Sequence, residues 1–363
     1  MILPPAPDSL DVDPGADAPL VVMAPIGFAR RPTPVAVVVA AALLAAVVGF
    51  FAVLAAIHRP AAPPPPPDLP PRFGPGTRER VDRLRDRAVA GLLSLRAKEG
   101  DFTTREGPGV DPAERKEATA FGVLGLTIAR RLGSQQPGLD AALRGARSML
   151  LRPAKARAGD STSRGLRVSA LATSLLALVV GGDVADRKHI EDGTVSLLAL
   201  TEPGPPIQGW PQGIAARAYA AILDAGRGDL LGPDPRTVVP VWDNLGESRD
   251  GADQRVSEAL ALAIRAAPGS SKVAEEIFAT VDADPIEWNG EQTDLTRWTL
   301  RAFLAARVNG GESWFRRVLG PLEQAVGEGG RVEGEVYGYP VARTALVLAI
   351  LWEGVDVRPP APR

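Results

Sequence analysis

The longest apolar run of the chain extends from Val35 to Ile57 and contains 23 residues without a charge. At a rise of about 1.5 Å per residue, a helix of this length crosses the hydrocarbon core of a bilayer, which is about 30 Å thick. A cleaved signal peptide is the alternative, but its apolar region is usually shorter, and prolines follow this run where a small-residue cleavage site would be needed. The pattern therefore predicts one retained transmembrane helix.

Basic residues beside this span indicate its orientation. Arg30 and Arg31 precede the span, and Arg59 and Arg72 follow it, so the two sides carry equal positive charge. Because Arg30 and Arg31 form a pair close to the apolar run, the positive-inside rule favours the N-terminus on the cytoplasmic side. We expect a single-pass protein of the cell inner membrane whose larger part is extracytoplasmic.

Proline dominates both flanks of the span. Residues 1–34 combine prolines with Asp and Ala and have too little apolar surface to offset the entropy cost of ordering, so we predict a disordered tail. Residues 58–77 include five consecutive prolines, from Pro63 to Pro67, and favour polyproline II, which makes a semi-rigid linker. Recognition of this linker by an SH3-like domain is the alternative to a simple spacer.

Beyond residue 77 the apolar positions recur with the period of an α-helix, and six stretches share one local pattern. Each stretch places a small residue before or among large aliphatic residues. The small residues are Ala120, Ser174, Ala218, Ala259, Ala302 and Ala345. The first two are 54 residues apart, and the later ones follow at intervals of 41 to 44 residues. This spacing indicates an internal repeat.

A second helical candidate precedes most of these stretches. These candidates cover residues 78–98, 139–151, 194–200, 271–281 and 313–326. A repeat of two helices at this period fits either an open HEAT-like solenoid or a closed α/α toroid. The polar connections at residues 100–116 and 327–340 are long for a solenoid hairpin, and they favour the toroid. We predict an all-α toroid of about six helical hairpins over residues 78–356, followed by a C-terminal tail at 357–363.

Small residues on the second helices, among them Gly122 and Gly125, suit close packing in an inner layer of such a fold. A coding bias toward Ala, Arg, Gly and Pro would produce the same pattern.

Composition excludes several kinds of chemistry. The chain has no cysteine, so it forms no disulfide, thiolate zinc site or thioester. Its formal net charge of −2 and mixed charges give no basic face for nucleic acid. No glycine-rich loop joins a strand to a helix, as a phosphate site would require. We therefore expect no metal site, no cofactor and no nucleic-acid partner.

The repeat resembles that of the squalene-cyclase and prenyltransferase-type α/α toroids, especially bacterial membrane-anchored relatives of undefined activity. In the first unit the segment from Leu92 to Phe102 contains a Gly-Asp-Phe sequence and precedes a Thr-Ala pair at the next helix. The later units carry further residues of the pattern: Trp288, Asp294, Trp298, Gly310, Trp314, Gln324, Gly327 and Thr344. The sequence departs from the pattern at Arg96, where the family prefers Gln, and after Gly330, where no aromatic residue follows.

The activities of this family need residues that the chain mostly lacks. Cyclases of the squalene-hopene type use an acidic Asp in an Asp-x-Asp-Asp motif, and the nearest match here, Asp282 and Asp284, ends in Pro285. Both residues are low-priority candidates for catalysis, and a turn that closes a helix is the alternative. Protein prenyltransferases need a zinc ligand set with Cys. The Asn289 to Gln292 segment lacks the cysteine of a thioester motif.

Aromatic and polar residues in and near the long connections form the remaining candidate site. In a toroid such loops gather at one mouth of the ring, where a ligand or a protein partner could bind. The candidates are Trp210, Trp288, Asp294, Trp298, Trp314, Tyr337 and Tyr339. Packing or capping at helix ends is the alternative role for such residues. The predicted function is a noncatalytic binding or scaffolding module at the cell envelope, and the alternative is a terpenoid cyclase-like or other lipid- or isoprenoid-acting enzyme.

Overall fold

The computed structural model describes residues 72–97, 100–102, 112–152, 164–201, 210–231, 270–282, 286–288, 292–332 and 340–355. By its contacts the chain divides at Pro64, and every described residue belongs to the second part, Pro65–Arg363. The predicted membrane span Val35–Ile57, the N-terminal tail, most of the proline-rich linker and the C-terminal tail lie outside the described residues.

The described residues are mainly helical and contain no strand, which confirms the all-α prediction. The helices are α2 (Arg78–Ser94), α3 (Pro112–Arg131), α4 (Leu139–Leu150), α5 (Arg164–Gly181), α6 (Arg187–Thr201), α7 (Trp210–Asp224), α9 (Ser270–Asp282), α10 (Gln292–Ala305), α11 (Glu312–Ala325) and α12 (Pro340–Val355), with the short 3-10 segments η1 (Val184–Asp186) and η2 (Gly228–Leu231). Five of the six repeated stretches fall in α3, α5, α7, α10 and α12, and the one around Glu258 lies outside the described residues.

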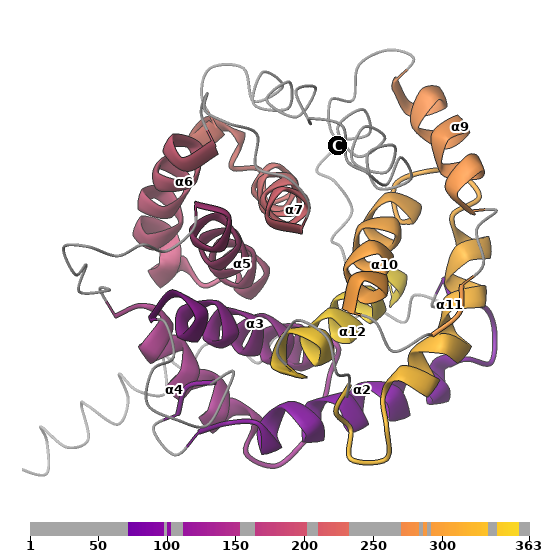
Figure 1. Ribbon diagram of the computed structural model, residues 1–363, viewed down its shortest axis with the longest axis horizontal. Coiled ribbons are helices and arrows are strands. Elements are labelled where there is room, and N and C mark those ends of the chain that lie inside the picture. Colours follow the sequence, from indigo (N-terminus) through magenta and orange to yellow (C-terminus); the bar gives the residue numbers. More distant parts are fainter. Residues whose placement is uncertain are drawn as a thin grey trace, which may run out of the picture. The chain divides into compact units, whose positions relative to one another are not determined.

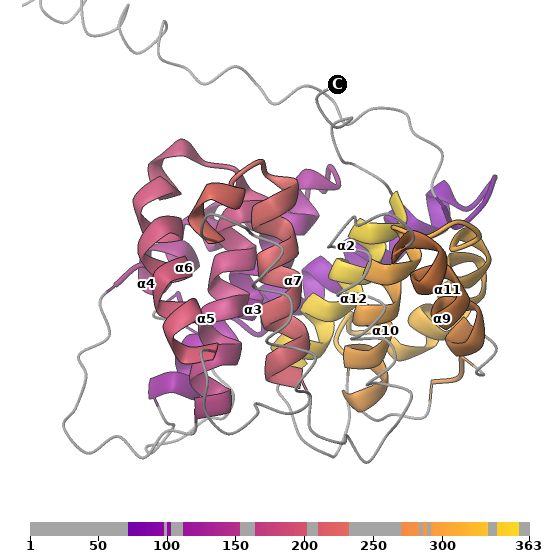
Figure 2. The same cartoon turned by 90° about the horizontal axis from the view of Figure 1, so that it is seen from above.

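The five helices that carry the repeated stretches contact one another in a cycle. α3 packs against α5, α5 against α7, α7 against α10, α10 against α12, and α12 against α3 (Figure 1). The preceding helices pack on this set: α4 lies against α3, α6 against α5, and α11 against α10, while α2 touches both α3 and α12. Figure 2 shows α5, α6 and α7 running alongside one another in this arrangement. The fold thus has two kinds of helix. The five helices that carry the repeated stretches have more of their surface buried than the helices that pack on them.

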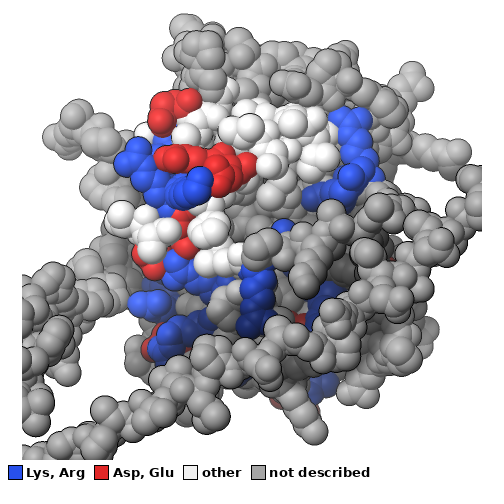
Figure 3. Space-filling model, turned by 90° about the vertical axis from the view of Figure 1, so that its left-hand side faces the viewer, with Lys and Arg blue, Asp and Glu red and all other residues white. Residues whose placement is uncertain are grey.

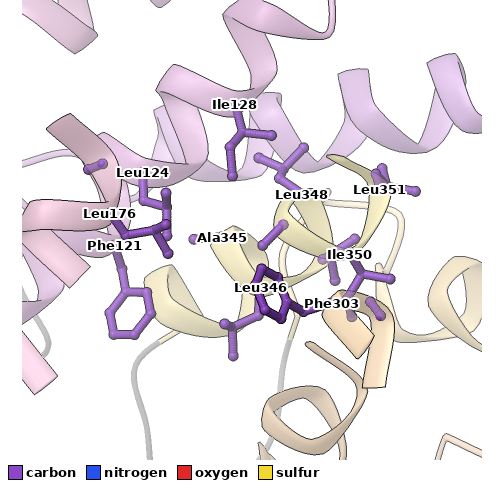
Figure 4. Close-up of a cluster of buried hydrophobic side chains, with 14 of the residues drawn as sticks. Phe121, Leu124, Ile128, Leu176, Phe303, Ala345, Leu346, Leu348, Ile350 and Leu351 are labelled. Atoms are coloured by element: carbon purple, nitrogen blue, oxygen red, sulfur yellow. The ribbon is translucent and has the colours of Figure 1, made fainter. Parts of the chain in front are cut away.

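Helix α12 lies in the centre of the hydrophobic core. Fourteen of its sixteen residues are buried, in agreement with a sequence that is apolar on every side. In Figure 4 its side chains Leu346 and Ile350 meet Phe303 of α10, while Leu124 and Leu176 approach from α3 and α5. The space between these four helices is filled by apolar side chains.

Two glycines of α3 allow this close packing. A Cβ atom added to Gly125 would lie 2.6 Å from a methyl carbon of Leu92 and 3.1 Å from the Cβ of Ala345. A Cβ atom on Gly122 would lie 2.1 Å from the ring of the fully buried Phe102. These separations are too short for a side chain, so the small residues are required by helix packing.

On length and composition alone, α5 is compatible with a membrane span, and it is the one such helix in the described part of the chain. However, α5 packs against α3, α6 and α7, and 56% of it is buried within the protein. A core helix of a soluble domain passes the same test, so α5 is weak evidence for membrane insertion.

We expect Gly122→Ala to lower the free energy of unfolding by about 1–3 kcal/mol, because the added methyl group must displace the ring of Phe102 in a filled core. Gly165→Ala is the matched control, since its Cβ would meet only the ring of Pro211 at 3.5 Å. Urea unfolding followed by tryptophan fluorescence measures both. Equal stability of the two variants would show that the core near Phe102 is loosely packed.

Candidate functional site

The acidic candidate Asp282 ends α9 and joins this helix to α11. Its carboxylate accepts hydrogen bonds from the guanidinium group of Arg317 and from the hydroxyl group of Ser313, the latter at 3.1 Å. Arg317 also donates to the backbone carbonyl oxygen of Asp282. This carboxylate is therefore engaged in holding two helices together, and its neighbour in the motif, Asp284, lies outside the described residues.

The structure places several of the candidate aromatic residues in the core. Trp314 is fully buried and packs edge-on against Phe315, with ring centroids 5.3 Å apart. Trp298 is 3% exposed, and the half-buried Trp288 packs against it at 6.2 Å. These rings contribute to helix packing. The side chains of the remaining candidates lie outside the described residues: Trp210, Asp294, Tyr337 and Tyr339.

A network of charged side chains, not anticipated from the sequence, joins α7, α10 and α12. Arg217 of α7 donates to Glu353 of α12 at 3.1 Å, and their side chains are only 3% and 5% exposed. Arg307, just after α10, lies 3.7 Å from the other carboxylate oxygen of Glu353 and forms an ion pair with Asp224 at the end of α7. Its guanidinium carbon lies 3.3 Å from the centre of the Phe303 ring. Glu353 is thus shared by cations from two neighbouring helices.

A second polar pair lies between α3 and α5. Glu117 is 7% exposed and accepts a hydrogen bond from the hydroxyl group of Ser169, which is 1% exposed. Burial raises the pKa of the Glu117 carboxyl to about 7, the Ser169 hydrogen bond opposes this change, and the nearby charge of Glu114 adds to it. One helical turn beyond Ser169, the fully buried hydroxyl of Thr173 has no hydrogen-bond partner among the residues that the structure describes. This end of the interface holds a carboxyl that can bind or release a proton near neutral pH.

The two polar groups flank the apolar cluster of Figure 4. Glu117 lies about one, two and three helical turns before Phe121, Leu124 and Ile128 on α3, and Ser169 lies two turns before Leu176 on α5. At the other end, Glu353 follows Ile350 on α12. Buried ionisable groups therefore lie near both ends of the apolar cluster, and apolar side chains occupy the space between. Among the described residues, no group of three or more His, Asp and Glu side chains could hold a metal ion.

No protein-family model, curated protein or solved structure matches this chain.

We expect the stability of the protein to depend on pH through Glu117. Its folded-state pKa lies above its ordinary value of 4.5, so the folded state keeps a proton that the unfolded state releases. The free energy of unfolding should fall as pH rises from about 4.5 to about 7, by about 3 kcal/mol in total. Glu117→Gln, which retains an oxygen acceptor for Ser169, should remove this dependence. Glu79→Gln, at an exposed side chain, is the control.

Replacing Glu353 by Gln should destabilise the protein by about 3 kcal/mol, because the buried guanidinium group of Arg217 and the partly exposed one of Arg307 lose the carboxylate that they share. Glu79→Gln removes an exposed ion pair with Arg83 and should cost less than about 1 kcal/mol. Urea unfolding at pH 7.5 compares the two variants. A similar small loss in both would mean that the Glu353 charge is not needed for helix packing.

Proposed function

We propose that this chain is a membrane-anchored α/α toroid that binds a partner at the cell envelope and has no catalytic activity. In this proposal Val35–Ile57 crosses the membrane and the proline-rich linker carries the helical domain. The cyclic contacts of α3, α5, α7, α10 and α12, with α2, α4, α6 and α11 packed on them, support the toroid.

The apolar packing between the described inner helices is the observation that carries the proposal. An enzyme of this architecture would need an open apolar space with ionisable groups directed into it. Here Phe303, Leu346 and Ile350 occupy the space between the helices, and α12 is buried on every side (Figure 4). The ion pair between Arg217 and Glu353 connects helices within this interior. A protein that binds its partner at an outer surface does not need an open space between its inner helices.

One observation favours the alternative, an enzyme that acts on a lipid or an isoprenoid. The carboxyl of Glu117 has a pKa of about 7 and lies at the end of the apolar cluster. A carboxyl with such a pKa is suited to proton transfer at neutral pH. Asp282 is less suited, because its carboxylate is held by Arg317.

Lipid extraction with mass spectrometry of the purified full chain, combined with photocrosslinking from Tyr337 in the producing cell, tests the proposal. We expect a reproducible protein crosslink and no stoichiometric lipid, because apolar side chains of the described residues occupy the space between α3, α5, α10 and α12. Crosslinking from Ser148, an exposed residue on α4, is the control.

A stoichiometric isoprenoid that Glu117→Gln removes, while Glu79→Gln retains it, would contradict the proposal and support the enzyme. Unfolding curves of both variants would show that the loss does not result from misfolding.

A further inference from the structure

A short segment before α2 covers one end of the most deeply buried helix. We call this segment, residues 72–77, the strap. Its Phe73 is 2% exposed, whereas Pro75 and Gly76 are open to solvent. Gly74 has a φ of 105° and Gly76 a φ of 75°, a backbone conformation that residues with a side chain rarely adopt. The strap therefore runs over the surface and inserts one aromatic side chain into the core.

The ring of Phe73 packs between α11 and the last turn of α12. It lies edge-on against the fully buried Phe315 of α11, with ring centroids 5.5 Å apart. A Cβ atom added to Gly354 of α12 would lie 2.3 Å from the Phe73 ring, so the ring occupies the space that a side chain at this position would need. The contact thus depends on a glycine at position 354.

The backbone of the strap contacts the same turn of α12. The N–H group of Arg72 donates to the carbonyl oxygen of Gly354 at 2.7 Å. This carbonyl is one of the last four of the helix, which have no partner within the helix itself. The strap therefore supplies both a hydrogen-bond donor and an apolar contact at the C-terminal end of α12.

Glu353, the residue before Gly354, carries the charge that the α7 and α10 regions share. Its carboxylate lies 3.1 Å from the guanidinium group of Arg217 and 3.7 Å from that of Arg307. Successive residues of a helix point about 100° apart, so this turn of α12 contacts the strap on one side and the two guanidinium groups on another. A change in the backbone of this turn consequently affects both sets of contacts.

We propose that the strap positions Glu353 for its ion pairs, so that withdrawal of Phe73 weakens the connection of α12 to α7 and α10. The strap directly follows Pro70 and Pro71 of the proline-rich linker. A partner that binds or displaces the linker therefore acts on the strap first, and through it on the charged network. The proposal concerns the helical domain and does not depend on the membrane anchor.

A double-mutant cycle in the full chain tests this coupling. Phe73→Ala removes the apolar contact of the strap, and Glu353→Gln removes the shared charge. If Phe73 acts through Glu353, the two variants lose part of the same stabilisation. The unfolding constant of the double variant should then be about ten-fold smaller than additive effects would give. Urea unfolding at pH 7.5 compares the variants with the unmodified chain.

Phe278→Ala is the matched control, because Phe278 is also buried, at 3% exposure, but belongs to α9. Its effect should add to that of Glu353→Gln. Additive effects of Phe73→Ala and Glu353→Gln would overturn the proposal, and so would equal coupling in the Phe278→Ala control.

Hydrogen exchange locates the effect of Phe73→Ala along the chain. Backbone amides at the C-terminal ends of α7 and α12 should exchange about ten-fold faster than in the unmodified chain, since local opening sets their rates. Helix α6 is the internal reference, because it lies across the domain from α11 (Figure 1). Figure 3 shows the side that carries α4 and α6, with charged side chains gathered toward its upper left.

Faster exchange in the strap alone, or an equal change in every helix, would overturn the proposal. Phe73→Leu serves if Phe73→Ala does not fold, because it removes the ring but keeps an apolar side chain at this position. It should give the same pattern with a smaller acceleration. Exchange at the end of α7 that matches the unmodified chain in the variant that folds would again contradict the coupling.

Discussion

A negative charge on the most deeply buried helix constrains the arrangement of its neighbours. α12 is apolar on all sides except near its ends, and Glu353 would be costly to bury without counter-charges. Arg217 and Arg307 supply those charges from the α7 and α10 regions. The register in which α7, α10 and α12 pack must therefore bring both guanidinium groups to the carboxylate of Glu353. Because the described residues of α7 and α10 have few direct contacts, the shared carboxylate is a principal connection between the α7 and α10 regions.

The two buried carboxyl groups, Glu353 and Glu117, affect the stability of the fold in opposite ways when they are ionised. Glu353 is paired with cations and is useful to the fold when ionised, whereas Glu117 is paired with a neutral hydroxyl and is favoured when protonated. Glu353 therefore stabilises helix packing in its charged form, while Glu117 makes the α3–α5 interface respond to pH near neutrality.

Local features were predictable from the sequence, and long-range pairings were not. The period of the apolar positions located α3, α5, α7, α10 and α12, because each helix must bury a stripe or its whole surface. Arg217 directly precedes Ala218 of the repeat, yet its partner Glu353 lies 136 residues away, and no local sequence pattern connects the two. The aromatic pattern also does not show whether a side chain points to the core or to the solvent. Trp298 and Trp314 occupy positions of the repeat pattern, and both rings are buried in the core.

The burial of the inner helices and the exposure of the outer ones together limit where this protein can recognise another molecule. The apolar surfaces of the inner helices pack against one another. Charged side chains such as Glu353 and Glu117 form ion pairs or hydrogen bonds inside the domain. The solvent-facing side of an outer helix packs against no other helix, so an apolar residue on that side does not contribute to the core. Val184 and Val195 are residues of this kind, and they flank a pair of opposite charges. These side chains are therefore available for contacts that the fold itself does not require.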